Sequence, residues 1–331
     1  MADEKHNPEW FIIVNPNAGR RKGDKDWPLI TKILTAADIR FQSVFTQHRM
    51  HALRLARKYV EMGYKNIMVV GGDGTLNEVV NGIFTQKKYP TNSITIGMIS
   101  VGTGNDWGRT FGIPHGYQEA VNVIKKGKTF LQDVGWVKFM QSGLEKNRFF
   151  ANMAGMGYDA MVAEKTNKQK DAGKAGPLSY FVNIFTSLFS FKESNTEIFV
   201  DDIGVLKAPI FTMVVGICNY NGGGMMQLPK AVPDDGNLDM TVITKLSRFS
   251  VVKNVRKLYD GSFISLPQVR MFRGKSFLIE SNPPIYMEAD GESLGHSPFK
   301  FGLIPLALQV IVGKDMRITV PANVHAPALT E

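Results

Sequence analysis

A glycine-rich turn between an apolar run and a predicted helix, at residues 67–82 (IMVVGGDGTLNEVVNG), constrains the fold more than any other stretch. The pattern predicts a buried strand that leads directly into a helix, as in an α/β sheet of parallel strands. Glycines allow a close approach to the backbone, and a helix N-terminus offers free N–H groups and a positive dipole end to an anion. A tight turn without a ligand is the alternative, but such a turn does not need Asp73 set among three glycines. We therefore interpret residues 71–75 as a candidate phosphate-binding turn.

Two more glycine-bearing turns follow predicted strands. Residues 99–110 (ISVGTGNDWGRT) leave an apolar run through glycine and threonine, and residues 15–23 (NPNAGRRKG) follow the first apolar run of the chain. In a parallel sheet, the loops at the carboxyl ends of the strands share one crevice. Three such loops, with Arg20, Arg21 and Lys22 beside them, indicate a polyphosphate site.

Two familiar phosphate-binding loops are excluded. The dinucleotide fingerprint requires glycine where this chain has Asn77, and the Walker loop requires glycine where the chain has Asn122. The sequence also lacks a zinc-spaced set of cysteines and histidines and the aromatic–basic interleaving of an RNA-binding strand. We therefore expect no nucleic-acid partner.

The order of the predicted elements indicates two domains. Up to about Val134 strand-like and helix-like patterns alternate, and beyond that point strand-like segments come more densely. We predict an α/β domain with a mostly parallel sheet over residues 8–134 and a mainly antiparallel, β-sandwich-like domain over residues 135–303. A C-terminal segment, about residues 304–320, is expected to pack back onto the first domain.

Composition limits the partners and the compartment. The 331 residues carry a formal net charge of +9 and a sequence pI of about 9.4, which favours anionic partners such as nucleotides, phosphorylated molecules or a membrane surface. A single cysteine, Cys218, excludes a disulfide within the chain and fits a cytoplasmic protein. We find neither a secretory signal nor an apolar stretch of the ~20 residues that span a bilayer. The sequence leaves the oligomeric state open, and a homodimer is possible.

Six motifs carry a resemblance to a known family. NPNAG, GGDGTLNEVVNG and VGTGND occur in the first predicted domain, and NMAGMGYDAMV, VPDDGNLDMTVI and MEADGE occur in the second. In this order and near these spacings they resemble the diacylglycerol kinase catalytic-domain family, most closely its bacterial soluble lipid kinases, with sphingosine and ceramide kinases as relatives. The resemblance runs from about Phe11 to about Val312 and implies a fold like that of NAD kinases and diacylglycerol kinases. GGDGT alone is less specific, because NAD kinases and phosphofructokinases carry it too.

The resemblance implies that the chain transfers the γ-phosphoryl group of ATP to a lipid hydroxyl, with diacylglycerol as substrate and phosphatidic acid as product. ATP and Mg²⁺ are the expected cofactors, and residues 135–303 would hold the lipid. The residues implied to line the nucleotide are Asn15, Pro16, Asn17, Ala18, Gly19, Thr46, Gly72, Asp73, Gly74, Thr75, Leu76, Asn77, Glu78 and Thr103. Asn77 and Glu78 also suit the first turn of a helix, where the dipole favours a carboxylate.

Three acidic residues are the implied catalytic groups. Asp73 would lie near the phosphates and their Mg²⁺, and Asp290 or Glu292 would take the proton from the attacking lipid hydroxyl. The stretch that contains Asp290 and Glu292, YMEADGE, also suits a simple Asp-Gly hairpin turn. Neither the residues nor the resemblance decides which of the two is the base.

A separate metal site is implied in the second domain. By similarity Asp235 would bind a structural Mg²⁺, helped by the backbone carbonyl groups of Val232 and Asn237. Without the resemblance, the same stretch, PDDGNLD, is a polar turn before a strand.

The lipid side is open to more than one interpretation. Residues 177–191 carry no charge, and a predicted helix there places Leu178, Phe181, Phe185 and Leu188 on one face, with lysines before and after. Such a helix suits peripheral contact with an anionic membrane, and it also suits a core position. The functional alternatives are a sphingoid-base or ceramide kinase and a non-catalytic lipid- or nucleotide-binding regulator. An NAD kinase would need a Gly-Ser-Thr-Ala-Tyr-like stretch in the second domain, which this chain lacks.

Overall fold

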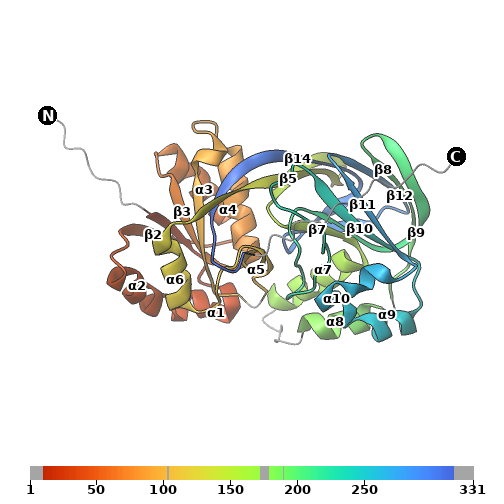
Figure 1. Ribbon diagram of the computed structural model, residues 1–331, viewed down its shortest axis with the longest axis horizontal. Helices are drawn as coiled ribbons and strands as arrows, with labels where there is room; N and C mark the ends of the chain where they lie inside the picture. Colours follow the sequence, from red (N-terminus) through yellow and green to blue (C-terminus); the bar gives the residue numbers. More distant parts are fainter. Residues whose placement is uncertain (1–9, 103, 172–178, 189, 317–331) are drawn as a thin grey trace.

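The computed structural model describes residues 10–102, 104–171, 179–188 and 190–316. Figure 1 shows two lobes joined by two long strands, β5 (Thr129–Gln141) and β14 (Glu292–Ile311). Within the described residues the strands form one 14-stranded network, whose main path is β11-β10-β9-β7-β13-β14-β4-β3-β1-β2. The two lobes therefore share a continuous sheet.

The first lobe is a parallel sheet with helices on both faces. Its strands pair in parallel in the order β4-β3-β1-β2. They are β1 (Trp10–Val14), β2 (Phe41–Phe45), β3 (Asn66–Gly71) and β4 (Thr95–Ser100). The helices are α1 (Ala18–Lys25), α2 (Trp27–Ala36), α3 (His51–Glu61), α4 (Asp73–Thr85), α5 (Asp106–Thr110) and α6 (Tyr117–Lys126), with a 3₁₀ turn, η1, at Thr91–Ser93.

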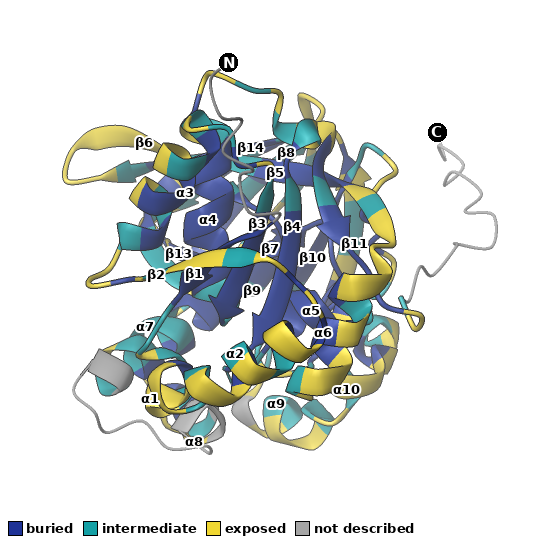
Figure 2. Cartoon of the chain, turned by 90° about the vertical axis from the view of Figure 1, so that its left-hand side faces the viewer, coloured by how far each residue is buried: buried dark blue, intermediate teal, exposed yellow. Residues whose placement is uncertain are grey.

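The apolar runs of the first lobe are continuous because both faces of the sheet are covered. Along β1, Phe11 and Ile13 pack with α3 and α4, whereas Ile12 and Val14 pack with α2 and α6. The strands β1, β3 and β4 are buried, whereas the edge strand β2 is partly exposed, and Figure 2 shows helices with exposed outer faces over the sheet. Because β1, β3 and β4 run parallel, their carboxyl ends lie at the same edge of the sheet.

The second lobe is rich in antiparallel strands. They are β6 (Leu144–Phe150), β7 (Met153–Gly157), β8 (Ser194–Val200), β9 (Ile203–Gly216), β10 (Leu238–Thr244), β11 (Val269–Gly274), β12 (Phe277–Asn282) and β13 (Tyr286–Ala289). The helices are α7 (Tyr158–Asp171), α8 (Ser179–Ser187), α9 (Arg248–Asn254) and α10 (Lys257–Asp260), with a second 3₁₀ turn, η2, at Ser262–Ser265. Strand pairing closes a ring, β9-β7-β13-β14-β12-β8 and back to β9. The predicted two-domain arrangement with a β-rich C-terminal domain is confirmed.

Strand β14 links the lobes. Its first part pairs antiparallel with β13 and β12, and its last part pairs in parallel with β4, where Gln309 is opposite Thr95. The segment after residue 304 thus returns to the first lobe, and residues 317–320 lie outside the described part. The expected borders at 134/135 and 303/304 fall inside β5 and β14, and they stay predictions. Glu292, the first residue of β14, pairs with Ala289 of β13 in the second lobe.

We expect Gly295→Ala to destabilise the protein by about 1–3 kcal/mol, because the added methyl group would overlap the carbonyl oxygen of Met140 across the β5–β14 pair. Gly204→Ala is the matched control, since its methyl group would make only ordinary contact with the Phe199 ring, 3.5 Å away. Urea denaturation of both variants measures the difference. Equal midpoints for the two variants would contradict a close β5–β14 contact at this position.

Candidate active site

The three glycine-bearing turns meet at one edge of the first-lobe sheet. A Cβ atom on Gly72 would lie 3.9 Å from the Cα atom of Gly102, and one on Gly19 would overlap the carbonyl oxygen of Val101. Gly19 also has a φ of +58°, which favours glycine. The Asn15 side chain links the turn at residues 15–23 to the turn at residues 71–75, because its Nδ2 donates to Thr75 Oγ1 at 2.9 Å. The three turns that the sequence places at one edge of the sheet therefore lie side by side.

The remaining residues expected to line the nucleotide lie in these turns or beside them, where the structure describes them. Thr46 follows β2, and its N–H donates to the carbonyl oxygen of Val14 at 2.8 Å. Asn17 is exposed, Pro16 and Ala18 are half-buried, and Leu76 is buried in α4. Thr103 lies outside the described residues.

Asp73, in the turn at residues 71–75, and Asp106, in the turn at residues 99–110, form a pair of neighbouring carboxylates. The Asp73 carboxylate accepts hydrogen bonds from the N–H groups of Asp106 and Trp107, at 3.2 and 3.3 Å, at the start of α5. The Asp106 carboxylate in turn accepts from the N–H groups of Gly223 and Gly224, at 2.8 and 2.6 Å. A Cβ atom on Gly104 would lie 3.4 Å from Asp73 Oδ2 and 3.5 Å from Asp106 Oδ2, so glycine leaves this space open.

The electrostatics of the pair favour a positive charge. Loss of solvation, followed by repulsion from Asp106, raises the pKa of Asp73 from 3.8 to about 7. Burial likewise raises the pKa of Asp106, against the effect of its two glycine N–H donors. A cation between the carboxylates would relieve the repulsion.

Asn77 and Glu78 contact protein groups. Asn77 Nδ2 donates to Asp290 Oδ2 at 2.9 Å, and Asn77 Oδ1 accepts from Arg148 Nε at 2.8 Å. The Glu78 carboxylate accepts from the N–H groups of Met50 and Ala52, at 2.7 and 3.0 Å. Glu78 therefore caps the N-terminus of α3, and Asn77 connects the two lobes.

Asp290 is a buried anchor in the turn between β13 and β14. Its carboxylate accepts four hydrogen bonds, from Asn77 Nδ2 and from three consecutive N–H groups, those of Ala151, Asn152 and Met153, at 2.9–3.1 Å. Burial raises the pKa of Asp290, and these donors oppose the rise. With each carboxylate oxygen accepting two bonds, Asp290 has little capacity left to receive a substrate proton.

Glu292, two residues further on, reaches the glycine turn of the other lobe. A Cβ atom on Gly74 would lie 2.8 Å from Glu292 Oε1, so the carboxylate lies directly against the turn. Glu292 Oε2 accepts from both Nε and Nη2 of Arg49, in an ion pair with the Glu292 side chain 22% exposed. Of the two candidate bases, Glu292 is the one that the fold brings to the phosphate-binding turn.

The expected metal loop of the second domain is tied to two neighbours. The Asp235 carboxylate accepts from the N–H of Asn237 at 3.0 Å and forms an ion pair with Arg273. Asp133 accepts from the N–H of Gly236 at 2.8 Å and holds the loop against β5. Burial, with a contribution from Asp235, raises the pKa of Asp239 to about 6, although Arg273 opposes this rise. Crowded carboxylates of this kind suit a hard cation, and Arg273 would compete with it.

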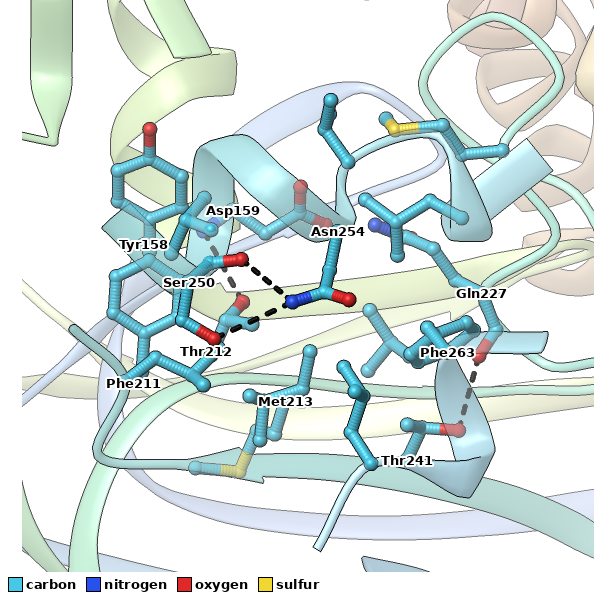
Figure 3. A pocket seen from close by; sticks show the side chains of 18 of the residues that line it. Tyr158, Asp159, Phe211, Thr212, Met213, Gln227, Thr241, Ser250, Asn254 and Phe263 are labelled. Carbon is cyan, nitrogen blue, oxygen red and sulfur yellow. Dashed lines mark hydrogen bonds between the residues drawn. The ribbon is translucent and has the colours of Figure 1, made fainter. Parts of the chain in front are cut away.

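An apolar pocket lies in the second lobe, between the sheet and the helices α7, α9 and α10 (Figure 3). Its cavity measures about 90 Å³, and its walls include Tyr158, Phe211, Met213, Val251, Leu258 and Phe263. Asp159 adds a carboxylate to this lining and approaches the buried Glu288 around Gly155, where a Cβ atom would contact both side chains. Burial, followed by repulsion from Asp159, raises the pKa of Glu288 well above its ordinary value.

Sequence reasoning missed several residues at the site. Asp106 belongs to the VGTGND motif, and the position of this motif after a predicted strand could have identified Asp106 as a site residue. Arg49 and Arg148 lie outside every motif, and only the fold brings them to Glu292 and Asn77.

Comparisons with known proteins agree with this geometry. Residues 9–137 match the diacylglycerol kinase catalytic domain, and residues 152–312 match the YegS C-terminal NAD kinase beta sandwich-like domain. A diacylglycerol kinase of Staphylococcus haemolyticus is 28% identical over 305 residues, which cover 92% of this chain and 88% of that protein. One from Staphylococcus carnosus is 28% identical over 309 residues, 93% of this chain and 96% of that protein.

Solved structures from Bacillus anthracis share the fold. One aligns with a TM-score of 0.71 at 24% identity over 92% of this chain and 97% of the other. Another, named a diacylglycerol kinase, aligns with a TM-score of 0.65 at 22% identity over 93% of this chain and 98% of the other. The resemblance to the diacylglycerol kinase catalytic-domain family is confirmed for residues 9–137, and the second match extends it over residues 152–312. The relatives' names support a lipid kinase.

Two absences hold for the described part of the chain. No helix in it has the length and apolar character needed to cross a membrane. No group of three or more Cys, His, Asp or Glu side chains in it is arranged to hold a metal ion. The expectation of Mg²⁺ therefore stays a proposal.

We expect the metal-free protein to lose stability as the pH rises from about 4 to 7, in part because of Asp73. The folded state holds the Asp73 proton up to about pH 7, whereas an ordinary aspartate releases it near 3.8, so the folded state binds more protons in this window. Asp73→Asn should make the fall shallower, and Asp202→Asn, an exposed aspartate of the β8–β9 turn, should not. The measurement is melting temperature against pH in EDTA. Equal slopes for wild type and Asp73→Asn would contradict the raised pKa.

Proposed function

We propose that this protein is an ATP-dependent lipid kinase that transfers the γ-phosphoryl group to a lipid hydroxyl, with diacylglycerol as substrate and phosphatidic acid as product. The observation that carries the proposal is the position of Glu292, which comes from the second lobe and lies against Gly74 of the phosphate-binding turn. Phosphoryl transfer depends mainly on positioning and on stabilising charge. A carboxylate opposite a phosphate cradle supplies the remaining requirement, a proton acceptor for the attacking hydroxyl.

In this proposal residues 8–134 bind ATP. The phosphates would lie along two of the turns, at Asn15–Gly19 and Gly72–Thr75, and Thr46 and Thr103 complete the proposed set of nucleotide residues. Asp73 and Asp106 would hold a Mg²⁺ ion, because repulsion from Asp106 raises the pKa of Asp73 despite the backbone donors and Gly104 leaves room beside both carboxylates. Bound there, the ion would neutralise phosphate charge.

In the transfer step the lipid oxygen forms a bond to the γ-phosphorus, and the bond from that phosphorus to the ADP oxygen breaks. The proton of the lipid hydroxyl passes to the Glu292 carboxylate. Arg49, paired with Glu292, places positive charge beside the same turn. Asp290 holds the β13–β14 turn and with it the starting position of β14, and Asn77 and Glu78 support the cradle from behind.

The apolar pocket of the second lobe is the proposed site of the lipid chains, within residues 135–303. Its apolar lining suits acyl chains, and Asp159 places a polar group at the pocket wall. A second candidate substrate is a sphingoid base, because its ammonium group would be attracted by the Asp159 carboxylate at the pocket wall. Diacylglycerol has no ammonium group, so the two candidate substrates differ in their interaction with Asp159.

The kinase proposal is tested by ATP-dependent phosphate incorporation into a panel of lipids in mixed micelles. We expect diacylglycerol to be phosphorylated by the wild type and not by Asp73→Ala, which loses the carboxylate next to the phosphates. Phosphorylation of a sphingoid base alone would select the second candidate. Normal turnover by Asp73→Ala, with incorporation unchanged, would overturn the proposed nucleotide site.

We expect Glu292→Gln to lower kcat by about 10²–10⁴-fold with little change in KM for ATP, because the loss is specific to the transition state. Asp290→Asn should instead lower the melting temperature, since an amide cannot accept all four hydrogen bonds and leaves a buried N–H group unpaired. Initial rates against ATP and lipid, with melting curves for both variants, separate the two roles. An unchanged kcat in Glu292→Gln would move the base elsewhere.

A structural Mg²⁺ at Asp235, with the carbonyl groups of Val232 and Asn237, is the remaining part of the proposal. A ligand bound only by the folded state stabilises it by about 2.7 kcal/mol at 100 times its dissociation constant. We expect the melting temperature to rise with Mg²⁺ in the wild type and in Asp202→Asn, and much less in Asp235→Asn. An equal rise in all three proteins would place the ion elsewhere.

A further inference from the structure

Helices α9 and α10 expose a row of apolar side chains on their outer face. Phe249 is 78% exposed, Val252 48% and Tyr259 46%. Ser247 caps α9, and Val255 and Arg256 keep helical backbone angles between the two helices, so residues 249, 252, 256 and 259 follow one side of a nearly continuous helix. We call Phe249, Val252, Lys253, Arg256 and Tyr259 the 249–259 face. An exposed aromatic and aliphatic row of this kind indicates a partner.

The charge of this segment identifies the chemistry of the partner. Residues 245–260 contain five basic residues and one acidic residue, and Lys253 and Arg256 are exposed beside Phe249 and Val252. Apolar side chains flanked by cations suit an anionic phospholipid surface, where the rings enter the interface and the cations meet the headgroups. A second copy of this chain is disfavoured, because two faces with the same excess of positive charge would repel each other.

The position of the face connects it to the apolar pocket. Ser250, Val251 and Asn254 line the pocket from the inner side of α9, and Phe249 and Val252 lie on the outer side. Figure 3 shows Ser250 and Asn254 turned toward the pocket. Figures 1 and 2 both place α8, α9 and α10 at the same end of the molecule. Helix α9 therefore separates the pocket from the surface that carries the 249–259 face.

The sequence left membrane contact or a core position open for the predicted helix of residues 177–191, and the described part of that segment favours the core. In α8, Asn183 is buried and donates to Thr166 Oγ1 and Gln169 Oε1 of α7. Leu188 packs against Tyr158 and Val162 in the interior, and Leu178 lies outside the described residues. Among the described side chains of this segment, Asn183, Ser187 and Leu188 are therefore buried, whereas Val182 is 53% exposed.

We propose that the 249–259 face docks on the surface of an anionic phospholipid bilayer, with α9 between the bilayer and the apolar pocket. Docking itself requires no catalysis. Its use to the enzyme rests on the proposed function, because a lipid that leaves the bilayer beside α9 would have only this helix between it and the pocket.

Vesicle co-sedimentation without ATP or substrate lipid tests docking separately from the kinase reaction. The vesicles contain phosphatidylcholine alone or phosphatidylcholine mixed with phosphatidylglycerol. We expect the wild type to bind the mixed vesicles and to be released by salt. Phe249→Glu should weaken binding at least about tenfold, and Lys253→Glu and Arg256→Glu at least about fivefold each. The matched controls are Ile203→Glu, 68% exposed in the wild type, and Lys146→Glu on β6, which should bind as the wild type does.

Several outcomes would overturn the proposal. They are equal binding to both vesicle types, no binding to either, or unchanged binding by Phe249→Glu and by both charge variants. If size-exclusion chromatography finds a dimer that Phe249→Glu dissociates while vesicle binding is unchanged, the face is an interface between two copies.

Kinetics then distinguish this proposal from the kinase assignment. On a short-chain, water-soluble diacylglycerol, Phe249→Glu should keep the wild-type rate, and on vesicle-borne diacylglycerol it should be slower. Equal rates on vesicle-borne lipid would overturn the docking role. Absence of phosphorylation by the wild type on every lipid would defeat the kinase assignment and leave the vesicle result to stand alone.

Discussion

The carboxylate of Asp290, buried where the two lobes meet, holds the candidate site together. It accepts one hydrogen bond from Asn77, on the helix that starts at the glycine turn, and three from consecutive backbone N–H groups of the second lobe. Burying a charge is costly unless hydrogen bonds replace its hydration, and four donors meet that requirement. Because β14 begins two residues later, this contact also sets the position of Glu292 relative to Gly74.

The site concentrates negative charge that the ligand-free protein tolerates poorly. Burial raises the pKa of Asp73, Asp106 and Glu288, and repulsion between neighbouring carboxylates adds to the rise for Asp73 and Glu288. Hydrogen bonds from the N–H groups of Trp107, Gly223 and Gly224 partly oppose the rise in the pKa of Asp73 and Asp106. Raised carboxylate pKa values of this kind cost stability in the ligand-free protein, and they agree with the proposal that a cation binds beside Asp73.

In the proposed reaction, the two lobes contribute different groups. The first lobe supplies glycine turns and helix N-termini at the end of a parallel sheet whose strands β1, β3 and β4 are buried, which suits the proposed binding of a polyanion. The second lobe supplies the apolar pocket, the buried pair of Asp159 and Glu288, and Glu292 at the meeting point. The strands β5 and β14 belong to both lobes, so the two halves of the site are fixed by strand pairing rather than by a flexible linker.

The sequence by itself determined the local features. Apolar runs that end in glycine turns predicted β1, β3 and β4 and the crevice at their carboxyl ends, because strand period and turn chemistry are properties of neighbouring residues. Only the tertiary structure separated Asp290 from Glu292, which are two residues apart: one is saturated by donors, and the other faces Gly74. It also turned Asn77 and Glu78 toward protein partners, and it paired Asp106 with glycines more than a hundred residues away. The reason is that burial, charge and hydrogen-bond capacity depend on contacts such as Asn77 with Asp290, 213 residues apart, which no local pattern encodes.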